Sequence, residues 1–102
     1  MLIYKEQLQS CTGTKPLYLP YPTVKEALRH VLHIDLQFGE PCIWYNVDVE
    51  NLKEYEYAVI AIGTGHNLAT DYLNNKYIGT LLLDNGDLVL HYFLINMDEF
   101  EK

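Results

Sequence analysis

Residues 77–94 read YIGTLLL, DNGD and LVLHYFL in succession, and this stretch decides the fold. The pair Asn85-Gly86 lies between two runs rich in β-forming residues, and both residues accept the positive φ of a type I′ turn. We therefore predict a β-hairpin in which Leu83 lies opposite Leu88. The other predicted pairs are Leu81 with Leu90, Gly79 with Tyr92, Leu82 with Val89, Thr80 with His91 and Ile78 with Phe93.

Both faces of this hairpin are mostly apolar. We therefore expect both to be covered, by a second sheet and by a partner subunit. A different hairpin, the one expected around Gly39-Glu40, has one polar face that carries the large aromatic Trp44. This face is expected to be exposed or to meet a partner. The candidate interface residues are Gln37, Trp44, Ile78, Leu82, Val89 and Phe93.

The chain has 102 residues, enough for one domain (1–102) with one core. Its formal net charge is −7. Duplex DNA, RNA and anionic membranes each require a basic surface, so this charge argues against them and permits docking on a basic protein face. No apolar run is long enough to span a membrane, and the N-terminal residues lack the features of a signal peptide. We therefore expect a cytoplasmic protein.

Residues 23–31 carry the only helix signal. Thr23 and Glu26 fit a capping box, and apolar residues follow at helical spacing. A strand pattern that starts at His30 competes with this signal, so helix and strand both stay open for the segment. We expect a helix that ends near residues 29–31, where the strand begins.

A second hairpin is expected around Gly39-Glu40, because glycine at the first central position suits a type II′ turn. This turn would pair Ile34 with Tyr45 and Gln37 with Cys42. The side chains expected on the core face are Leu32, Ile34, Leu36, Ile43, Tyr45 and Val47.

The remaining segments also favour β-structure. Residues 2–9 fit a first strand, and the prolines at the ends of Pro16–Pro20 confine that piece to a sheet edge. Residues 55–62 are apolar enough for a central strand covered on both faces. Residues 67–76 look irregular, and the acidic tail 96–102 is expected to fray. The fold class is all-β or β-rich α+β: a small antiparallel sandwich or partly open barrel of six to seven strands with at most one short helix.

The most unusual local sequence is GTGH at residues 63–66. Two glycines after a buried strand can expose backbone N–H groups as an anion-binding nest, which would suit a phosphate or nucleotide. The spacing matches neither a Walker loop nor a dinucleotide fingerprint. The alternative is a strand-ending turn with a hydrogen-bonded histidine. The candidate ligand-binding residues are Gly63, Thr64, Gly65, His66, Thr80 and His91.

Metal binding and covalent catalysis have little support. None of the four histidines lies at a known ligand spacing from another histidine or a cysteine. Cys11 and Cys42 lack the local signature of a nucleophile, and we interpret both as free thiols, with a disulfide as the alternative. We therefore expect no metal or cofactor and assign no catalytic residue.

The sequence resembles a family of small proteins encoded by bacteriophages and prophages that is known as a domain of unknown function. The resemblance covers nearly the whole chain, but residues 20–31 are several residues longer than the usual pattern. It implies an accessory protein of the bacterial cytoplasm and no particular activity. The segments that carry it are IYK at 3–5, LHIDLQ at 32–37, Gly39, PCIW at 41–44, GTGH at 63–66, YIGT at 77–80 and LVLHYF at 88–93.

The function we expect is therefore non-enzymatic binding. The chain would form a homo-oligomer and contact a host or phage protein with a basic face, for example a component of antiviral defence. One alternative is a protein that binds or sequesters a phosphate-bearing small molecule or nucleotide at GTGH. The other is a small histidine-dependent hydrolase.

Overall fold

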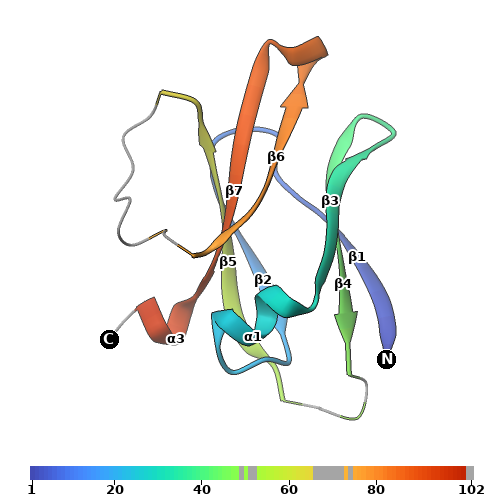
Figure 1. Cartoon of the computed structure of the whole chain (residues 1–102), viewed down its shortest axis with the longest axis vertical. Helices are drawn as coiled ribbons and strands as arrows, with labels where there is room; N and C mark the ends of the chain where they lie inside the picture. The colour runs from blue at the N-terminus through green and yellow to red at the C-terminus, as the bar shows by residue number, and fades with distance from the viewer. Residues whose placement is uncertain (49, 51–52, 66–72, 74, 101–102) are drawn as a thin grey trace.

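The computed structural model describes residues 1–48, 50, 53–65, 73 and 75–100. These residues form seven strands and short helical segments, arranged as two sheets that pack face to face (Figure 1). The elements are β1 (Leu2–Gln7), β2 (Gly13–Leu19), α1 (Val24–Arg29), β3 (Val31–Gln37), β4 (Glu40–Val47), β5 (Tyr55–Gly63), β6 (Tyr77–Leu83), η1 (Asp84–Gly86), β7 (Leu88–Asn96) and α3 (Met97–Phe100).

Both sheets are antiparallel. One has the strand order β1-β4-β3, and the other has the order β2-β5-β7-β6. The described strands do not close into a barrel, which confirms the predicted fold class in its sandwich form. The proline-flanked strand β2 lies at a sheet edge and β5 lies inside its sheet, as predicted.

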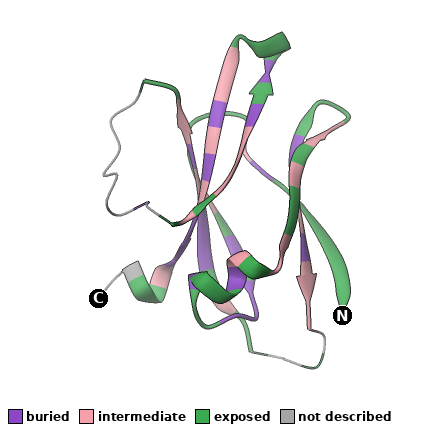
Figure 2. Ribbon diagram, in the orientation of Figure 1, coloured by how far each residue is buried: buried purple, intermediate pink, exposed green. Residues whose placement is uncertain are grey.

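The main core lies between the sheets, where the inner faces of β4, β5 and β7 are buried (Figure 2). Three buried tyrosines satisfy their hydroxyl groups on backbone carbonyl oxygens, which lets large rings enter the core. Tyr57 donates to Tyr21 O at 2.5 Å, Tyr21 donates to Asn46 O at 2.8 Å, and Tyr92 donates to Gln9 O at 2.7 Å. Burial raises the pKa of both Tyr57 and Tyr92 to about 12.

The hairpin of residues 77–94 has the predicted register over most of its length, from Leu83 opposite Leu88 to Gly79 opposite Tyr92. The turn is also as predicted. Asn85 and Gly86 have φ angles of 57° and 92°, and Asp87 N donates to Asp84 O at 3.1 Å. The predicted pair of Ile78 with Phe93 is wrong. An irregularity between Tyr77 and Gly79 places Tyr77 opposite Phe93, and Ile78 packs against the main core.

The second hairpin turns one residue earlier than predicted. Phe38 and Gly39 both have positive φ, and Gln37 pairs with Glu40 instead of Cys42. The pairing therefore shifts by two residues, and a shift of two keeps each side chain on its predicted face. Leu32 is the exception. The register breaks between Val31 and His33, so Val31 packs against the core and Leu32 is exposed.

The helix signal is confirmed. Thr23 caps α1, because its hydroxyl oxygen accepts a hydrogen bond from Glu26 N at 3.2 Å. At the other end of the chain, Asn96 is buried and its side-chain oxygen accepts from Asp98 N and Glu99 N. Its amide nitrogen donates to Pro22 O. Residues 96–99 are therefore tied to the fold, and residues 101–102 of the tail that is expected to fray lie outside the described residues.

Candidate functional site

A chain of hydrogen-bonding side chains runs across the outer face of the four-stranded sheet. His91, on β7, lies between two threonines: Nδ1 is 2.9 Å from Thr80 Oγ1, and Nε2 is 2.8 Å from Thr64 Oγ1. Thr80 Oγ1 is also 2.5 Å from the hydroxyl of Tyr77. The pairing of Thr80 with His91 across β6 and β7 brings these groups together.

Beside this chain of groups is a shallow pocket of about 300 Å³. Tyr77 and Phe93 form one wall through an edge-to-face contact, with ring centroids 5.6 Å apart. Three of the four GTGH residues are described, and all three line the pocket. The full described lining is Ile62, Gly63, Thr64, Gly65, Tyr77, His91 and Phe93.

The predicted ligand residues are therefore largely brought together. Gly63, Thr64, Gly65 and His91 line the pocket, and Thr80 supports His91 through a hydrogen bond. His66 lies outside the described residues. Tyr77 was not among the predicted site residues, because its place in the network depends on the irregularity at Ile78.

This pocket offers neutral polar groups. Each ring nitrogen of His91 lies beside a threonine hydroxyl, and a hydroxyl can donate or accept, so the imidazole can be satisfied in its neutral form. The described lining contains no Lys or Arg to neutralise a phosphate. It also has no carboxylate that could orient the histidine as a general base. The site suits a small polar molecule better than a charged one.

The other described histidines have local partners. His30 stacks on Tyr21, with ring centroids 4.1 Å apart and planes 5° from parallel. His33 Nε2 lies 3.3 Å from Asp35 Oδ2 at the surface. The pKa of Asp35 is lowered by a hydrogen bond from Leu36 N and by His33. Among the residues that the structure describes, no three His, Cys, Asp or Glu side chains gather as metal ligands.

The candidate interface residues do not form one surface. Trp44 and Gln37 lie on the three-stranded sheet, where Lys5 Nζ donates to Gln37 Oε1 at 2.5 Å. Leu82, with 59% of its surface exposed, lies on the other sheet. Val89 and Phe93 are half-buried on β7, the strand next to that of Leu82. Ile78 packs against the main core and so does not belong to an exposed interface. The predicted residues therefore belong to two separate sheets.

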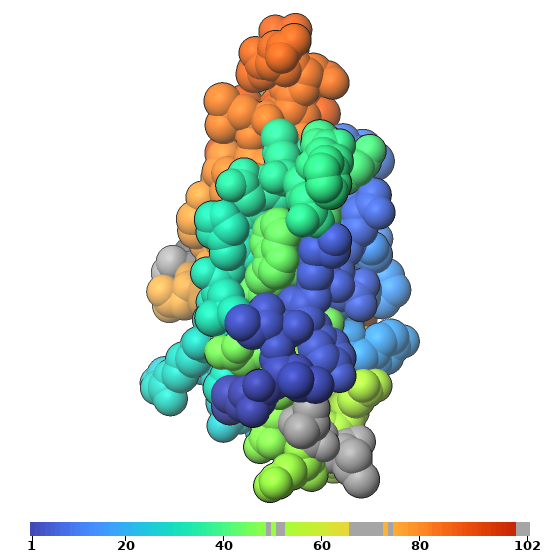
Figure 3. Space-filling model, turned by 90° about the vertical axis from the view of Figure 1, so that its right-hand side faces the viewer, coloured from blue at the N-terminus to red at the C-terminus, as the bar shows by residue number. Residues whose placement is uncertain are grey.

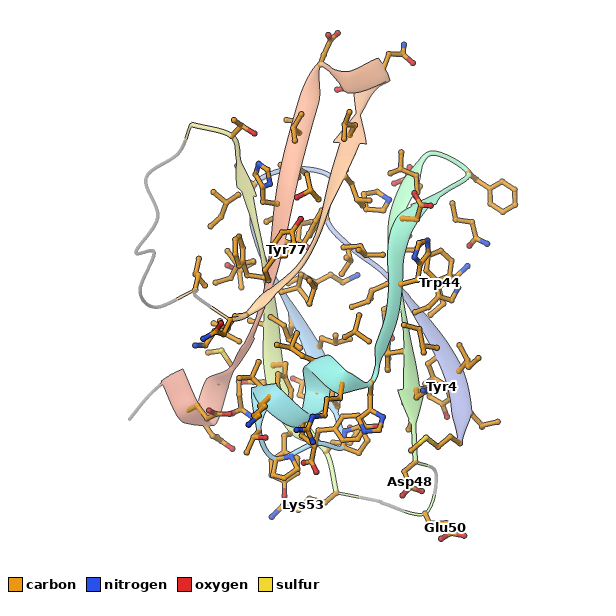
Figure 4. All side chains as sticks on the ribbon, in the orientation of Figure 1. Tyr4, Trp44, Asp48, Glu50, Lys53 and Tyr77 are labelled. Carbon is orange, nitrogen blue, oxygen red and sulfur yellow. The ribbon has the colours of Figure 1, made fainter. Side chains whose placement is uncertain are left out.

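A second groove, of about 520 Å³, lies between the edge strands β1 and β2 and was not predicted from the sequence. Its walls combine tyrosines and prolines with carboxylates. Figure 4 shows Tyr4 and Asp48 at the end of the sandwich where this groove opens. The described lining is Tyr4, Glu6, Pro16, Leu17, Tyr18, Pro20, Tyr45, Val47, Asp48 and Glu54.

Tyr45 is the most buried aromatic side chain of the groove, with 4% of its surface exposed. Its ring contacts Tyr4 at a centroid distance of 6.1 Å, and its hydroxyl makes no hydrogen bond within the described part of the chain. Burial raises the pKa of Tyr45 to about 12, and Glu6, Tyr4 and Glu54 add to the effect. The hydroxyl therefore keeps its proton, and it makes no hydrogen bond to the described residues of the core.

Alternation along β1 was the one available signal for this groove, because Tyr4 and Glu6 share a face. That signal cannot show which strand lies opposite, which depends on the packing of the two sheets.

Cys11 is exposed and Cys42 is buried, and neither forms a disulfide. No helix in the described segments is long and apolar enough to span a membrane.

Comparison with curated proteins and with solved structures finds no match. A family model does match, over residues 3–99. The match includes β2, all of β1 except Leu2, and the hairpin that carries His91. It confirms the resemblance to a domain-of-unknown-function family. The chain belongs to the family described as Domain of unknown function (DUF7352).

Proposed function

We propose that this chain is a non-enzymatic binding protein that acts through protein–protein contacts and forms a homo-oligomer. The observation that carries the proposal is the exposure of large apolar side chains on two edge strands, β1 and β6. Edge strands offer unpaired backbone groups, so apolar side chains beside them favour association with another chain. The exposed apolar side chains on these strands are Leu2, Ile3, Tyr4, Tyr77 and Leu82.

Self-association is assigned to the outer face of β6 and β7. There Leu82 is opposite Val89, and Tyr77 contacts Phe93. The inner face of the same hairpin is covered by the second sheet, as its apolar pattern requires. A second copy would supply the cover that the outer face lacks around Leu82.

Sedimentation velocity over a range of concentrations tests this assignment. Wild type should sediment as a species larger than the monomer, and Leu82→Asp should shift it to the monomer because it buries a charge in the interface. Leu32→Asp is a matched control, since Leu32 is an exposed leucine on a strand of the other sheet, with 48% of its surface exposed. A wild-type protein that stays monomeric at the highest concentration contradicts the proposal.

A second candidate is small-molecule binding at the His91 pocket. The observation in its favour is that both ring nitrogens of His91 are held by threonine hydroxyls beside an accessible pocket. A thermal-shift screen of nucleotides and neutral polar metabolites tests it, because a ligand at a hundred times its Kd adds about 2.7 kcal/mol of stability. The control is Thr64→Val, which should abolish a shift that depends on this pocket.

The setting is part of the proposal. The sequence resemblance to phage and prophage proteins supports an accessory role in bacterial cytoplasm, with a host protein as one kind of target. The acidic surface supports a target with a basic face, since opposite charges speed encounter and set orientation. Hydrolysis at the histidines has less support, because His91 has no carboxylate partner among the described residues.

A further inference from the structure

The two edge strands that flank the groove differ in their capacity to pair with another chain. β2 contains Pro16, and Pro20 follows it directly, so this edge has lost backbone donors. β1 (Leu2–Gln7) contains no proline and is exposed along its whole length. In Figure 3, which looks onto the right-hand side of Figure 1, β1 (dark blue) lies at the surface of the molecule. β1 is therefore the edge that can accept a strand.

The backbone groups that β1 presents can be identified. Leu8 N donates to Pro41 O, and Asn46 N is directed away from β1, because it donates to His30 O. Antiparallel pairing alternates between bonded and non-bonded pairs, so the groups of Tyr4 and Glu6 face β4 and those of Ile3, Lys5 and Gln7 face outward. The Lys15 ammonium group donates to Gln7 O. The outward groups of Ile3 and Lys5 remain for a partner.

The side chains beside this edge are suited to a cation. Tyr4 and Tyr18 supply aromatic rings to the lining, and Glu6, Asp48 and Glu54 supply negative charge. The described lining contains no Lys or Arg that would neutralise these carboxylates. Tyr45 also lines the groove, and its hydroxyl makes no hydrogen bond among the described residues. This oxygen is not one of the buried polar atoms left without a partner, so it reaches the surface. A guanidinium group could donate to this oxygen and to the carboxylates together.

We propose that an extended segment of a partner protein pairs with the free edge of β1 and inserts an Arg or Lys side chain into the groove beside Tyr45. Strand pairing supplies affinity through Ile3 and Lys5, and the groove selects the cationic side chain. This inference rests on the proposed binding function and specifies its partner: a basic, extended protein segment. It is independent of self-association, which is assigned to the outer face of β6 and β7 in the other sheet.

The probe is the blocked peptide acetyl-Thr-Val-Arg-Val-Thr-amide, titrated calorimetrically into the full chain. A second peptide carries citrulline, which has nearly the shape of arginine without its charge. We expect the arginine peptide to bind at least about tenfold more tightly, because close charge pairs at interfaces contribute strongly. Its affinity should also fall as salt rises. Equal affinities for the two peptides, or no binding at millimolar peptide, overturn the inference.

Three variants locate the site. Glu6→Gln, Glu54→Gln and Tyr45→Phe should each weaken the arginine peptide several-fold and leave the citrulline peptide unchanged. Tyr45→Phe removes a hydroxyl that makes no hydrogen bond in the described chain, so it should leave the melting temperature unchanged. Asp87→Asn, at the exposed tip of the other hairpin, is the matched control and should bind like wild type. If the control variant weakens binding as much as the groove variants do, the attraction comes from the net charge of the protein, and the assignment of the binding site to the groove is wrong.

A final arm tests strand pairing. Argininamide carries the same guanidinium group without a peptide strand, so it should bind much more weakly than the peptide. If it binds equally well, pairing with β1 is wrong. Sedimentation of the same samples reports self-association separately, so peptide binding can fail while the oligomer forms, and the two proposals are judged independently.

Discussion

A methyl group at position 79 has no room in this fold. Gly79 lies on β6 where β6 meets β3 of the other sheet, and a Cβ placed there would be 2.2 Å from Ile34 Cγ2. Carbon atoms normally approach to roughly 3.5–4.0 Å, so one strand must move by more than about 1 Å or Ile34 must leave its rotamer. The φ of Gly79 is outside the left-handed region, so alanine adds no backbone strain at this position.

Gly79→Ala should therefore destabilise the protein through overpacking alone. Overpacking lowers the free energy of unfolding by about 1–3 kcal/mol. Replacing glycine also reduces the flexibility of the unfolded chain, which offsets about 0.4–1 kcal/mol of this loss. The expected net loss is about 1–2 kcal/mol, which for a domain of this size lowers Tm by roughly 4–16 °C. Urea unfolding and thermal unfolding of the two proteins measure it.

The decisive measurement is a double-mutant cycle with Ile34→Leu, which removes Cγ2 and keeps the side-chain volume. The double variant should be more stable than the sum of the single effects predicts, by about 0.5–3 kcal/mol. Gly39→Ala is the control. It meets no atom within 4 Å, its φ is +81°, and its cost should not depend on residue 34. Additivity of Gly79→Ala and Ile34→Leu within about 0.5 kcal/mol would refute the proposed contact between the sheets.

Three further predictions concern single groups. Thr23→Ala should cost about 1 kcal/mol in urea unfolding, because it removes the cap on Glu26 N, and Thr23→Ser should restore most of it. Asn96→Ala should cost about 2–3 kcal/mol, because it removes the acceptor of Asp98 N and Glu99 N and the donor to Pro22 O. A loss below about 0.5 kcal/mol would show that residues 96–99 are not held by this side chain. The contribution of Tyr57 to stability should be constant up to about pH 10 and then fall toward pH 12, because the unfolded chain releases tyrosine protons near pH 10 while the folded pKa of Tyr57 is raised to about 12. Tyr57→Phe should make this fall shallower in melting curves.

Much of the fold could be predicted because local chemistry determined it. The Asn85-Gly86 turn fixed the register of five pairs in the 77–94 hairpin, and the capping box at Thr23 fixed the start of α1. Two of the errors occurred where one residue is inserted into a strand. Ile78 and Leu32 both lie at register breaks, and the period-two pattern cannot indicate an extra residue when its neighbours are also apolar.

The two candidate sites show the same limit. His91 and Thr80 could be paired from the hairpin register alone, and the loop that carries Thr64 was singled out by its glycines. The groove could not be found in this way, because Tyr4, Tyr18 and Tyr45 come from strands of both sheets. Their meeting depends on which edges of the sandwich stay open, and that is set by packing across the whole core.

The central claim is that the outer edge of β1, on the side away from β4, is free to receive a partner strand. Amide hydrogen exchange followed by NMR, with and without the arginine peptide, tests it most directly. The account predicts that exchange slows at Ile3 and Lys5, whose N–H groups face outward, and changes little at Tyr4 and Glu6, which face β4. Slowing that is absent from β1, or that appears at β6 instead, would contradict the account.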